Sequence, residues 1–128
     1  MKTVKKSTFS RVSRLRLRKA FEFVFAKGSK TATRDFVMWH TLETGPEAGK
    51  KIGVIASKKT GGAVRRNRLK RLLREAFRLS KDKLKDGARV IIYFKAGCDI
   101  DSLNEAASAL DRIFLKARIK NESRQNLP

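Results

Sequence analysis

The pattern of hydrophobic and polar residues changes its period along the chain, and each change marks an expected element. Near the start, four apolar residues share one helix face: Ala20, Phe21, Val24 and Phe25. Gly28 follows at the position after the helix end, where glycine is common. A short first helix is therefore predicted to end there.

From residue 29 to residue 57 the period is two, which is typical of β-strands. Residues 36–42 have substantial side chains on both faces, and residues 51–57 form a second run after the turn at 45–49. We expect these two strands to pair as a hairpin. A shorter strand is also expected at residues 29–33.

The helical period returns in residues 62–79, GGAVRRNRLKRLLREAFR, and this second helix is expected to end near residues 86–87. Residues 88–96 are almost continuously apolar, as in a buried strand. Ser102 and Glu105 then have the spacing of a capping box. The last helix has one apolar face, formed by Ala106, Leu110, Ile113, Phe114 and Ala117.

The elements follow the order α-β-β-β-α-β-α, which predicts one α+β domain built as a two-layer α/β sandwich. A chain of 128 residues suits one such domain and is too short for two. The domain is expected to cover residues 16–120. Residues 1–15 are expected to form a flexible basic arm, with a transit peptide as the alternative, and residues 121–128 a frayed tail.

The charge of the chain indicates the class of partner. Lys and Arg number 32 against 12 Asp and Glu, which gives a formal net charge of +20. So much like charge opposes compaction unless a polyanion neutralises it, and nucleic acid is favoured over an anionic membrane surface. The lone Cys98 excludes an internal disulfide, and no apolar run is long enough to span a bilayer. The cytoplasm is the expected compartment.

The second helix divides into an apolar and a cationic face. On a helical wheel the apolar face contains Leu69, Leu72, Leu73, Ala76 and Phe77. The opposite face contains Asn67, Lys70, Arg71, Arg74 and Arg78, with Arg68 just outside it and Arg65 and Arg66 in the first turn. Like charges four residues apart repel each other, whereas a solvated face usually mixes both signs. Phosphates would reverse this penalty, so the pattern favours nucleic-acid binding.

RNA is the favoured nucleic acid. No helix-turn-helix or zipper pattern surrounds the basic helix, and strands are expected on both sides of it. Such a scaffold is suited to a structured RNA recognised by its shape and backbone, rather than to the major groove of DNA.

Residues 57–78, SKKTGGAVRRNRLKRLLREAFR, closely resemble the signature of the protein subunit of bacterial ribonuclease P. The resemblance covers about residues 14–118. Outside the signature it rests on Phe21, Phe25 and Gly28 in the first helix and on Phe36, Val37 and Trp39 in a strand. Three positions depart from the family pattern: Thr60 replaces an aliphatic residue, Gly62 an asparagine and Trp39 a tyrosine.

The resemblance implies a ribosomal-S5-domain-2-like fold, with a left-handed β-α-β crossover that breaks the usual rule. It also implies a role in tRNA processing as the protein component of a ribonucleoprotein endonuclease. In that family a catalytic RNA with bound Mg²⁺ removes the 5′ leader from precursor tRNA, and the protein has no active site of its own. The implied partners are the catalytic RNA and precursor tRNA, with no DNA, membrane or organic cofactor.

Two surfaces follow from the resemblance and the basic face. The surface for the catalytic RNA comprises Lys58, Lys59, Arg65, Arg66, Asn67, Arg68, Lys70, Arg71, Arg74 and Arg78. The cleft for the single-stranded leader comprises Phe21, Phe25 and Trp39, with Arg66 and Asn67 at its edge. From the residues alone, core packing remains an alternative role for the three aromatic residues.

We expect no catalytic or metal-binding role for the other residues with reactive side chains. We expect His40 to be a core or edge histidine and Cys98 to be inert, and Asp99 and Asp101 to cap the last helix. No metal-ligand cluster or catalytic triad is recognisable. Two other functions remain open: a ribosomal or general RNA-binding structural protein, and a nuclease in its own right, against which the lack of a carboxylate cluster argues.

Overall fold

The computed structural model describes residues 18–44 and 49–120, so the predicted arm and tail lie outside the described residues. The order of elements is α1 (Arg18–Lys27), β1 (Ser29–Ala32), β2 (Phe36–Leu42), β3 (Lys51–Ile55), the 3-10 turn η2 (Lys58–Thr60), α2 (Ala63–Ser80), the 3-10 turn η3 (Lys81–Lys83), β4 (Ala88–Phe94) and α3 (Leu103–Ala117). The predicted α-β-β-β-α-β-α order is confirmed.

The four strands form one sheet in the order β1-β2-β4-β3. The predicted hairpin between β2 and β3 is wrong, because β4 lies between them, antiparallel to β2 and parallel to β3. The reason lies in β4, which is buried at five of its seven positions. A strand that is apolar on both faces is most stable in the middle of a sheet, where strands on both sides satisfy its backbone groups. The short strand β1 pairs with β2.

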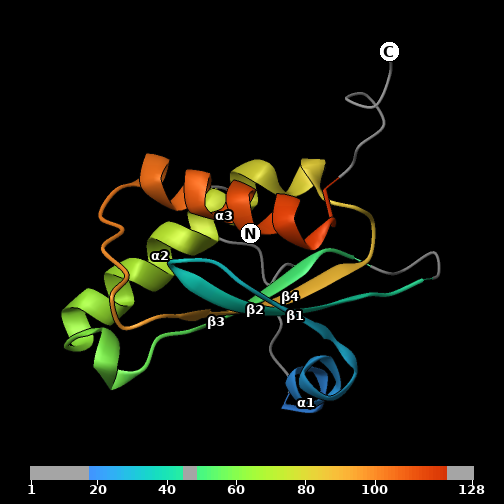
Figure 1. The fold of residues 1–128 in the computed structure, drawn as a ribbon, viewed down its shortest axis with the longest axis horizontal. Helices are drawn as coiled ribbons and strands as arrows, with labels where there is room; N and C mark the ends of the chain where they lie inside the picture. Colours follow the sequence, from blue (N-terminus) through green and yellow to red (C-terminus); the bar gives the residue numbers. More distant parts are fainter. Residues whose placement is uncertain (1–17, 45–48, 121–128) are drawn as a thin grey trace, which may run out of the picture.

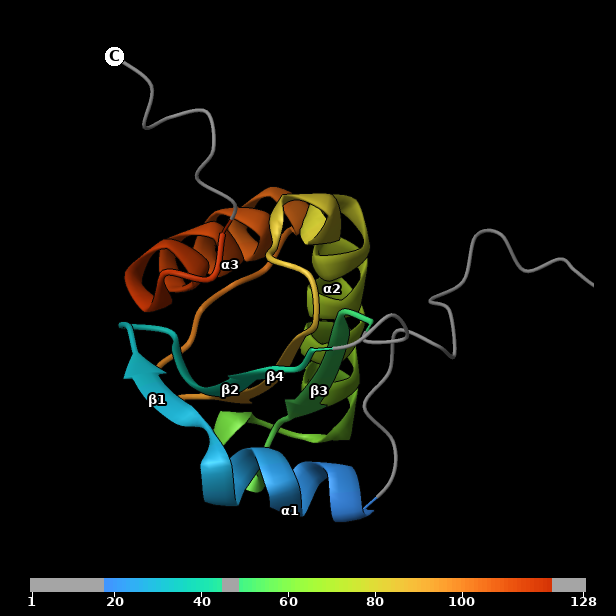
Figure 2. The same ribbon diagram turned by 90° about the vertical axis from the view of Figure 1, so that its right-hand side faces the viewer.

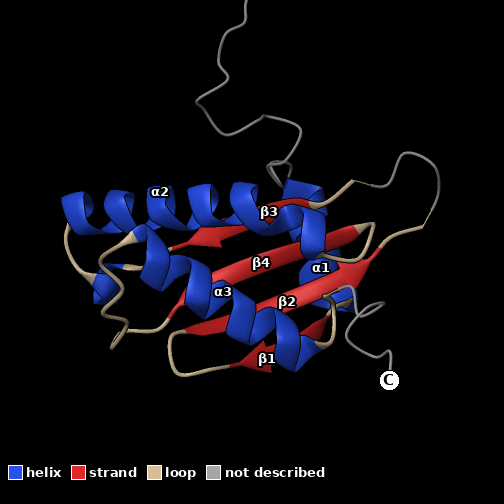
Figure 3. Ribbon diagram, turned by 90° about the horizontal axis from the view of Figure 1, so that it is seen from above, coloured by secondary structure: helices blue, strands red, loops and turns tan. Residues whose placement is uncertain are grey.

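The connection from β3 through α2 to β4 is left-handed. In Figure 3 the helices α2 and α3 lie in front of the sheet, and the parallel strands β3 and β4 run towards the left with β3 above β4. When the view is turned so that these strands point upward, β4 lies to the left of β3. This hand is rare for parallel strands, and the expectation taken from the family is confirmed.

The helices cover the sheet on both faces. Helices α2 and α3 pack side by side on one face, and α1 lies alone on the other (Figures 1 and 2). The main core fills the space between the sheet and α2 and α3; its largest members include Phe36, Phe77, Phe94 and Phe114. Under α1 a second, smaller cluster centres on Val24 and Ile91.

Helix α2 is shorter than predicted, since it ends at Ser80 rather than near residue 86. The chain turns through η3 so that Leu84 can enter the main core, where it is fully buried. Leu84 also forms a β-bridge with Lys120, and Lys85 N donates a hydrogen bond to the Ile119 carbonyl. Burial of one leucine therefore sets the helix end.

Candidate nucleic-acid interface

Core packing determines which face of α2 is turned outward. Leu69, Leu73, Ala76 and Phe77 are buried in the main core and Leu72 packs against it, as predicted. The opposite side of the helix is therefore presented to solvent. The predicted RNA-contacting residues lie along η2 and this side of α2, where Lys58, Lys59, Asn67, Arg68, Arg71 and Arg78 are exposed and Arg65, Arg66, Lys70 and Arg74 are partly buried.

The turn before α2 contains both departures from the family signature. Gly61 has φ 141° and ψ −171°, a conformation that essentially only glycine adopts. Gly62 is the N-cap of α2 in extended backbone and supplies no side-chain hydrogen bond to the helix. Thr60 is buried, and its hydroxyl finds no hydrogen-bond partner in the described part of the chain. Helix α2 therefore begins without the polar cap that an asparagine would supply.

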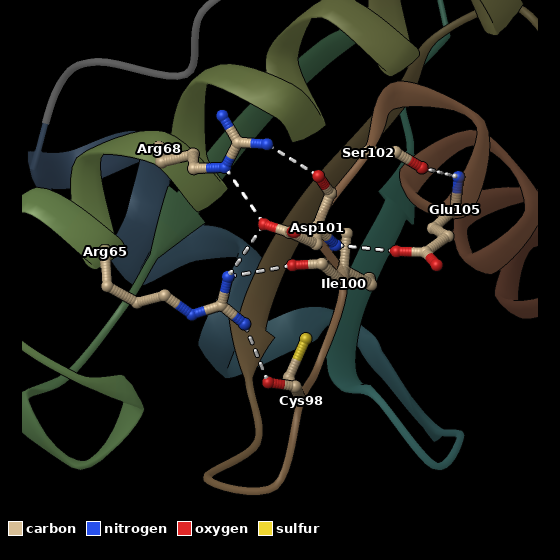
Figure 4. Close-up of polar contacts among 7 residues, drawn as sticks. All are labelled: Arg65, Arg68, Cys98, Ile100, Asp101, Ser102 and Glu105. Carbon is tan, nitrogen blue, oxygen red and sulfur yellow. Dashed lines mark hydrogen bonds and ion pairs between the residues drawn. The ribbon is translucent and has the colours of Figure 1, made fainter.

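Two arginines of the basic helix bind the loop between β4 and α3 (Figure 4). Arg65 donates from its two Nη atoms to the carbonyls of Ile100 and Cys98, at 2.9 and 3.1 Å. Arg68 donates from Nε to Asp101 Oδ1 at 3.1 Å and from Nη2 to the Asp101 carbonyl at 2.6 Å. These contacts join residues that are 33 to 35 positions apart in the sequence, so the spacing of residues within one helix could not predict them.

The expected capping role of Asp101 is wrong. The N-cap of α3 is Ser102, whose Oγ accepts a hydrogen bond from Glu105 N at 3.1 Å. The Asp101 carboxylate faces Arg68 instead. Glu105 accepts from the Asp101 backbone N at 2.7 Å, one residue earlier than in the predicted capping box. The position of the Asp101 carboxylate is thereby fixed relative to the start of α3.

The other cations of η2 and α2 differ in whether they have an acidic partner. Arg78 binds Glu75, one turn earlier, with Nε 3.1 Å from Oε1. That hydrogen bond lowers the pKa of the Glu75 carboxyl below its usual value. By contrast, no ion pair involves Lys58, Lys59, Lys70 or Arg71 in residues 18–44 and 49–120. The Arg66 Nε is buried and has no hydrogen-bond partner in the same ranges.

The three predicted aromatic residues meet where α1 crosses the sheet. The rings of Phe25 and Trp39 lie edge to face with centroids 5.0 Å apart, and Phe21 is 6.4 Å from Phe25. Phe21 and Trp39 pack against the Val24–Ile91 cluster but are only partly buried, and Phe25 is 40% exposed. These rings thus combine core packing with accessible surface. Within the described residues, no ring contact joins Arg66 or Asn67 to them.

Sequence reasoning missed Tyr93 and Lys30, which share this face of the sheet. Tyr93 lies two residues after Ile91 on β4, opposite Val37 and diagonal to Trp39, and is only partly buried. The continuous apolar run of β4 hid the alternation that turns Tyr93 towards α1. Lys30, opposite Trp39 on β1, holds its Nζ 5.6 Å from the Trp39 ring centroid, a cation–π contact.

Of the remaining reactive residues, Cys98 is buried and His40 is partly buried. Desolvation raises the pKa of the Cys98 thiol, which weakens it as a nucleophile. Burial lowers the pKa of His40, whose Nδ1 has no hydrogen-bond partner in the described part of the chain. Within the same ranges no three His, Cys, Asp or Glu side chains gather as metal ligands, and no helix is long and apolar enough to cross a membrane.

Comparison with known proteins gives consistent matches. The model of the family described as Ribonuclease P matches residues 9–118. The ribonuclease P protein component of Bacillus velezensis is 36% identical over 111 residues, which cover 87% of this chain and 94% of that protein. The corresponding protein of Brevibacillus brevis is 32% identical over 109 residues, covering 85% and 86%.

Solved structures agree with the sequence matches. The RNase P protein of Staphylococcus aureus superposes with a TM-score of 0.74 at 25% identity, over 85% of this chain and 98% of that chain. The RNase P protein of Thermotoga maritima gives a TM-score of 0.57 at 27% identity, over 82% and 87%. The sequence signature, the fold with its left-handed crossover and these matches lead to one conclusion: the chain belongs to the ribonuclease P protein family.

Proposed function

We propose that this chain binds the catalytic RNA of ribonuclease P and the 5′ leader of precursor tRNA in the cytoplasm. In this proposal the RNA subunit cleaves the leader from the tRNA, and the protein assists at low Mg²⁺ concentration. The observation that supports it most directly is the cationic face of η2 and α2, which the main core holds towards solvent.

The proposed surface for the catalytic RNA is this cationic face. Lys58, Lys59, Lys70 and Arg71 have no acidic partner in residues 18–44 and 49–120, so their charges are available to phosphates. Each phosphate contact releases condensed counterions, which makes the affinity strongly dependent on salt. Arg66, Asn67, Arg68, Arg74 and Arg78 complete the proposed surface, whereas Arg65 uses both Nη atoms on backbone carbonyls and is assigned a supporting role.

The proposed surface for the leader is the α1 side of the sheet. Phe21, Phe25 and Trp39 offer partly exposed rings, and Tyr93 adds a fourth aromatic residue on the same face. Aromatic rings stack on unpaired bases of any sequence, at about 1–3 kcal/mol per base. Arg66 and Asn67 are kept in the proposal as phosphate contacts at the edge of this surface.

The Mg²⁺ of the reaction is assigned to the RNA. Magnesium sites in proteins use carboxylates with substrate phosphates, and the described residues bring no three candidate ligands together. The chain's proposed contribution is to bind and orient the two RNAs.

Reconstitution tests the proposal. The full chain is mixed with a bacterial catalytic RNA and precursor tRNA at low Mg²⁺, and we expect faster release of the 5′ leader than with the RNA alone. No gain in leader cleavage would overturn the proposal. Cleavage by the protein without the RNA subunit would instead indicate a nuclease in its own right, and tight binding to ribosomal RNA with indifference to the leader a structural RNA-binding protein.

The leader surface has its own test. Tyr93→Ala should reduce the preference for precursor over mature tRNA in the presence of the catalytic RNA, and Tyr93→Phe should retain it because the stacking face remains. An equal preference in Tyr93→Ala and the wild type would remove Tyr93 from the leader surface.

A further inference from the structure

The loop between β4 and α3 contacts α2 through three backbone carbonyls and through the carboxylate of Asp101. The Asp101 carboxylate accepts a hydrogen bond from Arg68 Nε, and the Asp101 backbone carbonyl accepts one from Arg68 Nη2 (Figure 4). The same carboxylate lies 3.9 Å from Arg65 Nη1. Although the Asp101 side chain is 73% exposed, it therefore has a defined position against two arginines of α2, Arg65 and Arg68.

Asp101 is itself held by the start of α3. Its backbone N donates to Glu105, whose own backbone N is bound by the N-cap Ser102. Helix α3 is anchored in the main core by five buried residues: Ala106, Ala109, Leu110, Ile113 and Phe114. A continuous series of contacts thus runs from the core through α3 and Asp101 to the guanidinium of Arg68.

The contacts to Asp101 occupy only one edge of that guanidinium. Arginine has five N–H donors in a planar fork, and Arg68 uses its Nε and one Nη2 hydrogen on Asp101. The Nη1 atom of Arg68 has no ion-pair or hydrogen-bond partner within residues 18–44 and 49–120. The Arg68 side chain is 48% exposed, and the unused hydrogens of Nη1 and Nη2 form the second edge of the fork, which has the geometry to bind a phosphate bidentately.

We propose that Asp101 is a positioning residue, which fixes Arg68 so that the free edge of its guanidinium receives a phosphate of the catalytic RNA. This inference rests on the proposed function of α2. An arginine that is immobilised in the folded protein loses less conformational entropy when it binds, so its contact with RNA is stronger.

When Asp101 is replaced, the positioning role predicts a change in RNA affinity opposite in sign to the change that net charge alone predicts. Replacing Asp101 with a neutral residue raises the net charge of the protein by one, which favours binding to a polyanion. If Asp101 acts by positioning Arg68, the same replacement must weaken binding because the arginine is released.

The test measures the affinity of the full chain for the catalytic RNA over a range of salt concentrations. Asp101→Ala should bind about threefold to tenfold more weakly than the wild type, as expected for loss of part of one charged hydrogen-bonding contact. The salt slope should also fall by nearly one counterion, as for Arg68→Ala. Asp101→Asn keeps an acceptor for Arg68 Nε and should restore most of the affinity.

Asp82→Ala is the matched control. Asp82 is an exposed acid in η3, so its removal makes the same charge change away from Arg68, and affinity should stay equal or rise. Circular dichroism confirms that each variant is folded at the temperature of the assay. The double variant Arg68→Ala/Asp101→Ala should bind no more weakly than Arg68→Ala alone, because Asp101 acts only through Arg68.

Three results would overturn the positioning role: affinity of Asp101→Ala equal to or above that of the wild type, no rescue by Asp101→Asn, or additive losses in the double variant. In each case the wild type still binds the catalytic RNA, so the proposed function stands. If the wild type itself neither binds this RNA nor stimulates leader cleavage, the proposed function and the positioning role both fail.

Discussion

The ring of Phe21 on α1 occupies the space that a side chain at Gly53 of β3 would need. An ideal Cβ built on Gly53 would lie 2.5 Å from Phe21 Cζ, well inside van der Waals contact. Gly53 lies beside Ile91 in the parallel register, so the ring rests on the sheet next to the small cluster under α1. The absence of one side chain on an edge strand thus lets α1 approach the sheet closely.

Gly53→Ala should therefore displace Phe21 and lower the free energy of unfolding by about 1–3 kcal/mol, the usual cost of overpacking. Urea unfolding followed by circular dichroism measures this change. Gly97→Ala is the matched control, because nothing lies within 4 Å of its ideal Cβ. Equal stability of the two variants would show that the ring can move aside at no cost.

Gly62→Asn should stabilise the protein. Gly62 caps α2 at φ −74° and ψ 179°, a conformation open to any residue, and its ideal Cβ meets nothing within 4 Å. Asparagine would add the missing side-chain hydrogen bond and reduce the freedom of the unfolded chain, together worth about 0.5–1 kcal/mol. Thermal unfolding should rank Gly62→Asn above Gly62→Ala, which has no capping group; the reverse order would contradict this account of the helix start.

Thr60→Val should also stabilise the protein, by about 1 kcal/mol. The Thr60 side chain is buried and its hydroxyl has no hydrogen-bond partner in the described part of the chain, so the hydroxyl is desolvated without compensation. Valine has nearly the same shape and no polar atom. Thr60→Ser, which keeps the hydroxyl and loses the methyl group, serves as the comparison and should be less stable than the wild type. A loss of stability in Thr60→Val would reveal a partner for the hydroxyl.

His40 should make stability depend on pH near neutrality. Burial lowers its pKa in the folded protein, so the unfolded chain binds more protons between that value and its ordinary value of about 6.5. The free energy of unfolding should therefore fall as the pH is lowered from 7 towards 5. Since His40 is the only histidine, His40→Gln should reduce this fall.

Urea titrations of both proteins at pH 7 and pH 5 test the His40 prediction, because the difference between them cancels the contribution of the carboxylates. Identical pH dependence in the wild type and in His40→Gln would show that the histidine is protonated as easily in the folded protein as in the unfolded chain.

Local periodicity predicted the helices and strands well, but it did not predict their pairing. The apolar face of α2 was read correctly because each helix position has a fixed direction relative to its neighbours. The position of β4 between β2 and β3 depends on which strand is stabilised most by a central place in the sheet. That can be judged only by comparing all the strands of the chain. The adjacency of β2 and β3 in sequence favoured a hairpin that the sheet does not contain.

In the candidate site, too, features within one element were predictable and contacts between elements were not. The spacing of Lys70, Arg74 and Arg78 revealed a cationic face, whereas the pairing of Arg68 with Asp101 depends on the path of a loop 33 residues away. Tyr93 was overlooked because an apolar run conceals which side each residue faces until the neighbouring strand is known. Properties of one element were thus readable from sequence, and contacts between distant elements were not.

The unequal size of the two hydrophobic clusters gives the two faces of the sheet different local stability. Helix α1 has one buried residue, Val24, whereas α2 has four and α3 has five. Backbone amides of α1 should therefore exchange with solvent through opening events far smaller than global unfolding, while those of α2 and α3 stay protected. If the proposed function holds, the aromatic face can loosen and re-form around RNA leaders of different sequence, while the cationic face keeps a fixed shape.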